Sequence, residues 1–309
     1  NRRHIVGRAM SQTVTAAVIG LGSMGYGIAG SALRAGHKTH GFDVNEAQTA
    51  KFIADGGAPG ALEEVAAAID VAVIVVLNAE QTETVLFGQA GIVPRMSHGS
   101  VVVACATVPP AFARAMASQA AEYGVHYLDA PISGGSIKAA QGQLSIMAAG
   151  TEEAFAAARP VLDAISETVF ELGDAAGAGS AMKAVNQMLA GVHIAAMAEA
   201  MTFGMTQGVA PDTFLEVISK CAGSSWMLEN RAPHIIAGDY TPHSSVNIWP
   251  KDLGIVLDIA KEARFGAPIT AAALQQYLAA AGQGLGQEDD AAVAKVYARN
   301  AGLKLPGET

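Results

Sequence analysis

The chain has 309 residues, of which 51% are hydrophobic and 15% are charged, which excludes an extensively disordered protein. The formal net charge is −9 and the basic residues cluster only at positions 1–8, which argues against nucleic acid as a partner. Two cysteines are too few for a disulfide framework, and the eight histidines show no metal-ligand spacing. We therefore expect a cytoplasmic protein without a bound metal.

The N-terminal residues do not have the pattern of a targeting segment. Residues 1–9 are basic but lack an apolar core of signal-peptide length, and Met10 is interpreted as the natural start. Residues 1–12 are therefore expected to be an extension outside the fold. No stretch is expected to span a membrane, because glycines and polar residues such as Lys183 interrupt the longest apolar run, residues 177–208.

Strands and helices are predicted to alternate through the first half of the chain. Strands are predicted at 15–19, 37–42, 71–77, 100–104, 125–128, 143–149 and 168–172, with helices between them, and residues 15–19 and 71–77 are apolar runs. This alternation predicts an α/β domain with a Rossmann-type doubly wound sheet over residues 13–175. Only helices are predicted over residues 176–309, so the second domain is expected to be all-α. A long helix within residues 177–208 is expected to join the two domains.

A glycine-rich motif follows the first predicted strand and opens the first helix. Gly20 permits a tight turn, Gly22 lets a pyrophosphate approach the backbone, and Gly25 lets the helix pack on the strand. Asp43 ends the second strand, and its carboxylate would bind the adenosine ribose and repel a 2′-phosphate, which favours NAD over NADP. The alternative is a glycine-rich turn without a ligand. The residues expected to bind the cofactor here are Gly20, Leu21, Gly22, Ser23, Met24, Gly25 and Asp43.

Three more loops follow predicted strands, at the edge where ligands bind in such sheets. The first contains Leu77 and Asn78, and the second contains Thr107, which could contact the nicotinamide ribose. In the third, the Ser133 hydroxyl precedes two glycines whose backbone N–H groups are exposed, and this arrangement suits a carboxylate. A flexible turn without a ligand would have the same composition.

The predicted helix within residues 177–208 is apolar around most of its circumference. One stripe holds Ala190, Ile194, Met197 and Met201 and another holds Met182, Val185, Leu189 and Ala196, so burial on several sides is expected. Lys183, Asn186 and Gln187 lie together on one face. Lys183 could extend into water, or burial on this helix could lower its affinity for the proton, as a general acid/base requires.

Taken together, the motifs resemble the β-hydroxyacid dehydrogenase family, whose best-known member is 3-hydroxyisobutyrate dehydrogenase. GLGSMG at 20–25, DAPISGG at 129–135, GAGSAMKAVNQ at 177–187 and KDL at 251–253 occur in the order and spacing of that family. The resemblance covers residues 14–306. It implies a Rossmann domain, a long helix and an all-α domain that makes much of the oligomer contact, so a homo-oligomer, dimer or tetramer, is expected.

The resemblance also implies roles for individual residues. It implies NAD as the cofactor, a small hydroxy acid as the substrate, Lys183 as the catalytic lysine and Asn186 as the residue that holds it. Substrate binding is expected of Ser133, Gly134, Gly135 and Gln187, and cofactor binding of Leu77, Asn78, Thr107 and Lys251. Ala106 departs from the family, whose members commonly have serine there.

Three further segments, 223–231, 238–242 and 286–290, resemble the L-threonate dehydrogenase subgroup, which oxidises a four-carbon sugar acid with NAD. Ser224, Ser225 and Asn230 could bind additional substrate hydroxyls, and for Ser224 and Ser225 the alternative is helix capping and turn chemistry. A 3-hydroxyisobutyrate dehydrogenase or a tartronate semialdehyde reductase would share every motif and is an open alternative. Lys183 argues against an imine reductase and, with the acidic charge, against a non-catalytic chromatin-associated relative.

Overall fold

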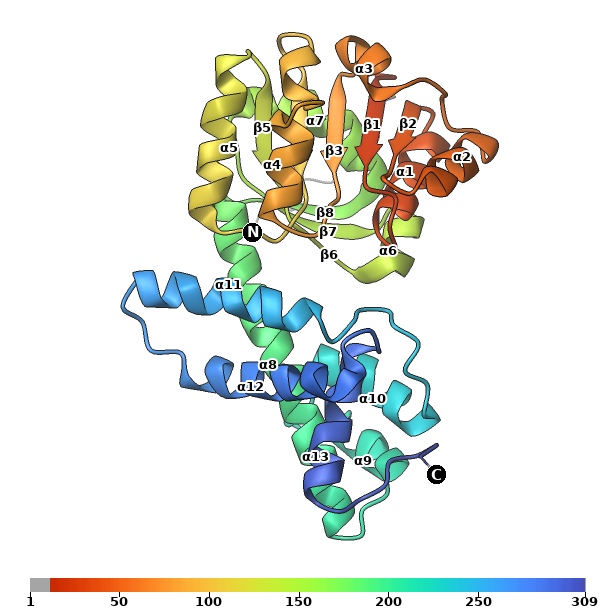
Figure 1. Cartoon of the computed structure of the whole chain (residues 1–309), viewed down its shortest axis with the longest axis vertical. Coiled ribbons are helices and arrows are strands. Elements are labelled where there is room, and N and C mark those ends of the chain that lie inside the picture. The colour runs from red at the N-terminus through yellow and green to blue at the C-terminus, as the bar shows by residue number, and fades with distance from the viewer. Residues whose placement is uncertain (1–11, 309) are drawn as a thin grey trace. The chain divides into compact units, whose positions relative to one another are not determined.

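The computed structural model describes residues 12–308 (Figure 1). Residues 1–11, which include Met10 and nearly all of the expected extension, lie outside the described residues. The chain divides into two compact units between Lys183 and Ala184, at a point within the long helix α8 (Ala178–Thr206).

A parallel sheet of five strands organises the first unit. The strands are β1 (Thr15–Ile19), β2 (Lys38–Phe42), β3 (Val71–Ile74), β4 (Val101–Ala104) and β5 (His126–Asp129), in the order β2-β1-β3-β4-β5. The chain changes direction across the sheet between β1 and β3, which is where ligands bind in open α/β sheets. Because all five strands are parallel, their carboxyl ends meet at one edge. The predicted Rossmann-type fold is confirmed.

Alternate residues of these strands face two separate cores. Ala16 and Val18 face the core that α1 (Gly25–Arg34) and α7 (Glu152–Ile165) cover. Ala17 and Ile19 face the opposite core, which α4 (Ala79–Phe87) and α5 (Pro110–Glu122) cover, and Figure 1 shows these two helices on the near face. Burial on both faces explains why the central strands β1, β3 and β4 are nearly continuous apolar runs. The shorter elements of this unit are α2 (Glu46–Ala54), α3 (Leu62–Val65), η1 (Ala66–Ala68) and η2 (Val93–Arg95).

The later strands form a second sheet and do not extend the first, so the expectation of one continuous sheet is wrong. β6 (Ile132–Ser133) pairs antiparallel with β7 (Leu144–Ala148), which pairs parallel with β8 (Ser166–Glu171). Helix α6 (Gly135–Gln141) follows β6 and was not predicted. An apolar run indicates a strand but not its partner strand, because pairing is decided by residues far away in the chain.

The second unit is built from helices, as predicted, over the residues that the structure describes. After α8 come α9 (Pro211–Ile218), α10 (Trp226–Ala237), α11 (Ile248–Glu262), α12 (Pro268–Ala280), η3 (Ala281–Leu285), η4 (Asp290–Val293) and α13 (Ala294–Asn300). Their core includes the fully buried Ile194 and Tyr277, and Trp249 stacks on Tyr277 with ring centroids 5.6 Å apart.

Helix α8 differs from the sequence expectation in two respects. Its stripe of Ile194, Met197 and Met201 is buried, but Met182, Val185 and Leu189 on the other stripe are 45%, 53% and 52% exposed. Sequence periodicity identifies an apolar stripe but not what covers it. By length and composition alone, with a mean hydropathy of 1.3 over 18 residues, α8 is also long and apolar enough to cross a membrane. The core helix of a globular protein is often as long and as apolar as this, and 39% of the 18-residue stretch is buried.

Candidate active site

The loop Gly20–Gly25 joins β1 to α1 at the point where the sheet order changes. Gly20 has a φ of 96°, a conformation that glycine adopts at little cost. A Cβ on Gly25 would lie 1.7 Å from the Gly20 carbonyl oxygen, so only glycine lets the helix start so close to the loop. No atom lies within 4 Å of the Cβ position of Gly22, which leaves the backbone accessible there. This open backbone at a helix start fits the pyrophosphate of a dinucleotide.

Asp43 follows β2, and its carboxylate is bonded to the glycine loop. The Leu21 N–H donates to Oδ2 at 2.6 Å, and the Asn45 N–H donates to Oδ1 at 2.8 Å. These bonds hold the carboxylate at the sheet edge where the adenosine ribose of a dinucleotide binds in this fold. The following residue, Val44, is fully exposed and uncharged.

The loops after β3 and β4 reach the same edge. Asn78 is the N-cap of α4, where its Oδ1 accepts a hydrogen bond from the Gln81 N–H at 2.8 Å. Leu77 is 65% exposed, and Thr107 is partly buried in the loop before α5. Beside this loop, burial raises the pKa of the Cys105 thiol to about 12. The thiolate is therefore disfavoured, and Cys105 does not suit proton transfer.

Ser133 ends β6 and precedes the two glycines that open α6. Its backbone is held opposite Ser145 of β7. Gly134 and Gly135 have φ values of 132° and 76°, conformations that favour glycine. No atom lies within 4 Å of the Cβ position of Gly135. The loop therefore offers a hydroxyl beside accessible backbone N–H groups, which suits an anionic group of a ligand.

Lys183 is buried near this loop. Only 9% of the residue is exposed, and Nζ donates a hydrogen bond to the Ile132 carbonyl oxygen at 2.9 Å. Ile132 directly precedes Ser133, so the lysine amine and the serine loop lie together in the first unit. Lys183 therefore does not extend into water, which was the alternative.

In the second unit, three of the expected site residues belong to one polar network. Asn186 Nδ2 donates to Gln187 Oε1 at 2.9 Å, and Gln187 Nε2 donates to Asp252 Oδ2 at 2.6 Å. Lys251 Nζ lies 2.7 Å from Asp252 Oδ1, as an ion pair without the alignment of a hydrogen bond. Both ends of the Gln187 amide thus have protein partners. Sequence reasoning missed Asp252, although an acid next to the motif lysine was a signal for it.

The serines that could have bound substrate hydroxyls have local partners. Ser225 is the N-cap of α10, where its Oγ accepts a backbone hydrogen bond from Leu228 at 3.1 Å. Ser224 Oγ donates to Glu229 Oε1 at 2.6 Å. Ser225 therefore caps α10, and Ser224 bonds to a side chain in the first turn of the same helix. Asn230 Oδ1 accepts a hydrogen bond from the Arg231 guanidinium.

The same segments continue into a buried ion pair between α10 and η4. Arg231 Nε lies 2.6 Å from Asp290 Oδ1, and Trp249 Nε1 donates to Asp290 Oδ2 at 3.0 Å. Asp290 is fully buried, which raises the pKa of its carboxyl group, and the Arg231 guanidinium opposes that shift. His234 Nδ1 lies 2.9 Å from Oδ1 of the adjacent Asp289, which is also fully buried. The segments that resemble the subgroup therefore build much of the polar interior of the second unit.

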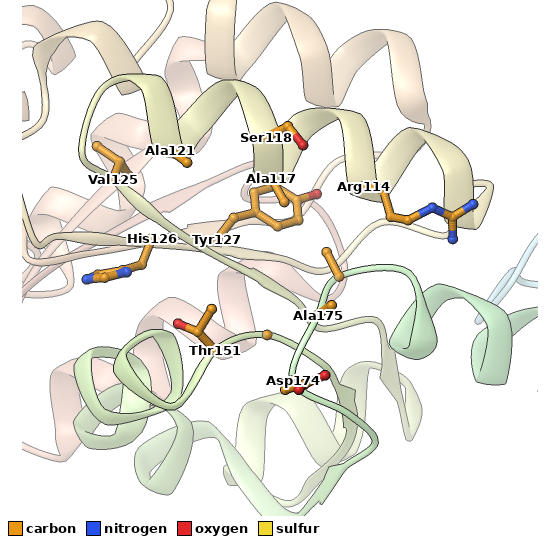
Figure 2. Close-up of a pocket in the computed structure, with 12 residues that line it drawn as sticks. Arg114, Ala117, Ser118, Ala121, Val125, His126, Tyr127, Thr151, Asp174 and Ala175 are labelled. Carbon is orange, nitrogen blue, oxygen red and sulfur yellow. The ribbon is translucent and has the colours of Figure 1, made fainter.

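A separate pocket of about 400 Å³ lies beside β5, the edge strand of the five-stranded sheet (Figure 2). It is lined by α5, β5 and residues 150–151 and 174–176. Tyr127 lies between these segments, and its buried hydroxyl has no hydrogen-bond partner in the part of the chain that the structure describes. The residues expected to bind cofactor or substrate do not line this pocket. The candidate active site is therefore the carboxyl edge of the sheet.

Family models match both halves of the chain. Residues 15–173 match the NAD binding domain of 6-phosphogluconate dehydrogenase. Residues 177–297 match the NAD-binding region of NADP-dependent 3-hydroxyisobutyrate dehydrogenase.

Individual relatives are similar over nearly the whole chain. L-threonate dehydrogenase of Cupriavidus necator is 50% identical over 292 residues, which cover 94% of this chain and 97% of the relative. L-threonate dehydrogenase of Escherichia coli K12 is 42% identical over 293 residues, or 94% and 96% of the two chains. A crystal structure of 3-hydroxyisobutyrate dehydrogenase from Salmonella typhimurium is 45% identical, with a TM-score of 0.86 over 92% of this chain and 99% of that chain.

Proposed function

Because the chain belongs to the β-hydroxyacid dehydrogenase family and is a nicotinamide-dependent oxidoreductase, we propose that it oxidises L-threonate to 2-dehydro-L-erythronate with NAD. Relatives named L-threonate dehydrogenase, at 42% and 50% identity over nearly the full length, support this substrate. The observation that carries the proposed mechanism is the buried Lys183 amine, 2.9 Å from the Ile132 carbonyl oxygen and next to the Ser133 loop.

In the proposed reaction, Lys183 is the general base that removes the proton from the substrate hydroxyl. The nicotinamide ring, when bound, would accept the hydride from the substrate carbon that bears this hydroxyl. The Ile132 carbonyl oxygen orients the amine, and Ser133 with Gly134 and Gly135 holds the substrate carboxylate. In the reverse direction the ammonium of Lys183 returns the proton to the forming alkoxide. Asn186 and Gln187 lie one turn further along the same helix, on the same face.

A panel of acids tests the substrate. L-threonate, D-threonate, 3-hydroxyisobutyrate and the reduced form of tartronate semialdehyde are each mixed with NAD and enzyme, and the absorbance of NADH is followed. We expect the highest kcat/KM for L-threonate. A second candidate is 3-hydroxyisobutyrate, since the 45% identical crystal structure bears that name. A higher kcat/KM for that acid would replace the proposed substrate.

Asp43 leads to a prediction about the cofactor. Its carboxylate is held beside the glycine loop by Leu21 and would repel a 2′-phosphate, so kcat/KM should be at least tenfold higher with NAD than with NADP, about 1.4 kcal/mol. Asp43→Asn should narrow this difference, because an amide carries no charge. Equal kcat/KM values for the two cofactors in the unaltered enzyme would contradict the role given to Asp43.

Ser133 leads to a second prediction. If its hydroxyl holds the substrate carboxylate, Ser133→Ala should raise KM for the acid by a factor equivalent to roughly 1–3 kcal/mol. The Kd for NAD, measured by calorimetry, should not change, because the glycine loop and Asp43 hold the dinucleotide. A weaker NAD affinity with an unchanged KM for the acid would assign the loop to the cofactor instead.

We further propose residues 13–175 and 176–309 as the two domains, and a homo-oligomer as the working assembly. The ranges of the two family matches support this division. The exposed Met182, Val185 and Leu189 on α8 support a partner subunit, since apolar side chains in a row favour burial. Helix α8 is proposed as a core helix of a cytoplasmic enzyme, because Ile194, Met197 and Met201 pack in the core of the second unit.

A further inference from the structure

The carboxylate of Asp129, at the end of β5, holds the start of helix α8. Oδ2 accepts hydrogen bonds from the Gly177 and Ser180 N–H groups, both at 2.8 Å. Oδ1 accepts a third hydrogen bond from the Ser180 hydroxyl at 2.7 Å. The first N–H groups of a helix have no partner within the helix, so an acceptor from outside is required there. Asp129 provides it from another part of the fold.

Asp129 is itself held firmly. Its residue is 1% exposed, and its backbone pairs with Ala149 through two hydrogen bonds of 3.0 and 2.9 Å. A Cβ on Gly179 would lie 2.5 Å from the Asp129 carbonyl oxygen and 2.5 Å from the Met147 carbonyl oxygen. Only glycine therefore allows the helix start to approach β5 and β7 so closely. The three hydrogen bonds and this contact define how far α8 is rotated and where along its axis it begins.

The charge of Asp129 suits this position. A helix of 29 residues carries a partial positive charge at its first turn, which favours a carboxylate there. Burial raises the pKa of Asp129, while the hydrogen bonds from Ser180 and Gly177 act against that shift. Burying a carboxylate is unfavourable unless it is well bonded, so the geometry at this helix start is strongly specified.

The segment that contains Asp129 also binds the lysine. Ile132, three residues after Asp129, accepts the hydrogen bond from Lys183 Nζ, and Lys183 lies three residues after Ser180 on the helix. One short segment thus contacts α8 at its first turn and again one turn later. A small rotation of the helix would separate the amine from the Ile132 carbonyl oxygen.

We propose that Asp129 is a positioning residue for Lys183, which sets the rotation and the starting point of α8 so that the amine lies beside the Ser133 loop. The inference rests on the proposed function, in which Lys183 transfers the proton. Asp129 acts through the helix and does not itself contact the reacting atoms.

The test compares Asp129→Ala with Asp129→Asn. Misplacement of a catalytic group by about 1 Å can cost 10²-fold, so Asp129→Ala should lower kcat by about 10²-fold. Asparagine keeps one side-chain oxygen that can accept hydrogen bonds from the helix start, so Asp129→Asn should keep more activity, with a fall of about tenfold. KM for the acid and Kd for NAD should stay within about twofold, since loss of position affects the transition state and not ground-state binding. If Asp129→Ala does not fold, the same measurements are made on Asp129→Asn and Ser180→Ala instead.

Thr151→Ala is the matched control. Thr151 caps α7 in the same unit, where its Oγ1 accepts the Ala154 N–H at 3.2 Å. This variant also loses a helix cap, but α7 carries none of the proposed catalytic groups. Its kcat should therefore equal that of the unaltered enzyme. A comparable fall in kcat for Thr151→Ala would show that any lost cap has this effect and would overturn the inference.

A double-mutant cycle separates this inference from the proposed function. If Asp129 acts through the lysine, adding Asp129→Asn to Lys183→Met should change the residual kcat by less than about twofold. The same tenfold fall in both backgrounds would overturn the inference. The inference would also be overturned if Lys183→Met inactivates the enzyme but Asp129→Asn leaves kcat unchanged. In that case the proposed function would still stand. A fully active Lys183→Met enzyme would overturn the proposed function itself.

Discussion

Replacing Lys183 with methionine should lower kcat by about 10²- to 10⁴-fold, the range that general acid–base catalysis contributes. Methionine keeps the length and the apolar stem, but it cannot exchange a proton. The Ile132 carbonyl oxygen loses its hydrogen bond, while the glycine loop and Asp43 are untouched. Binding of NAD, measured by calorimetry, should therefore persist while the formation of NADH nearly stops.

Lys220→Met is the control for this prediction. Its side chain is 72% exposed on the surface of the second unit, where it pairs with Glu216 at 3.6 Å. Removal of this amine should leave kcat unchanged. A Lys183→Met enzyme with more than about a tenth of the normal kcat would lie outside the range for proton transfer. The proton would then have to pass to another group, and the buried Cys105, whose pKa is raised to about 12, does not suit that role.

Replacing Arg231 with methionine should lower the free energy of unfolding by about 3–5 kcal/mol, more than Lys183→Met or Lys220→Met. It leaves the fully buried Asp290 carboxylate without its cation, with Trp249 Nε1 as a remaining donor. Urea unfolding followed by tryptophan fluorescence measures the effect. Both tryptophans, Trp226 and Trp249, belong to the second unit and therefore report on the unit that contains the ion pair.

The stability lost in Arg231→Met should depend on pH in a defined direction. Burial raises the pKa of Asp290 in the folded protein above its unfolded value, so the folded state binds the proton more readily. The cost of the buried charge therefore falls as the pH is lowered from neutrality, and the loss caused by Arg231→Met should become smaller. Asp290→Asn in the same chain should likewise recover part of the lost stability.

Lys220→Met serves again as the control, because it removes an exposed ion pair of the same unit. Exposed pairs contribute about 0–1 kcal/mol, so its unfolding curve should nearly coincide with that of the unaltered protein. If Arg231→Met is as stable as this control, the prediction is wrong. The attraction between the two charges would then only offset the cost of removing them from water.

Features that depend on a few neighbouring residues could be predicted from the sequence. The glycine loop requires one conformation at Gly20 and one close approach at Gly25, and both requirements are visible in the motif. The central strands β1, β3 and β4 appear as apolar runs, and the alternation of strands with helices predicted the confirmed fold. The spacing of Lys183, Asn186 and Gln187 placed them on one helix face. The motifs also indicated the family and the nicotinamide cofactor, which the relatives confirm.

The tertiary structure decided the features that join residues far apart in the chain. Asp129 and Ser180 are separated by 51 positions and Gln187 and Asp252 by 65, and no local pattern pairs them. The second sheet and the exposed stripe of α8 also escaped prediction. Periodicity and turn chemistry act over a few residues, whereas a buried polar group is satisfied by whichever partner the whole fold brings within hydrogen-bond distance.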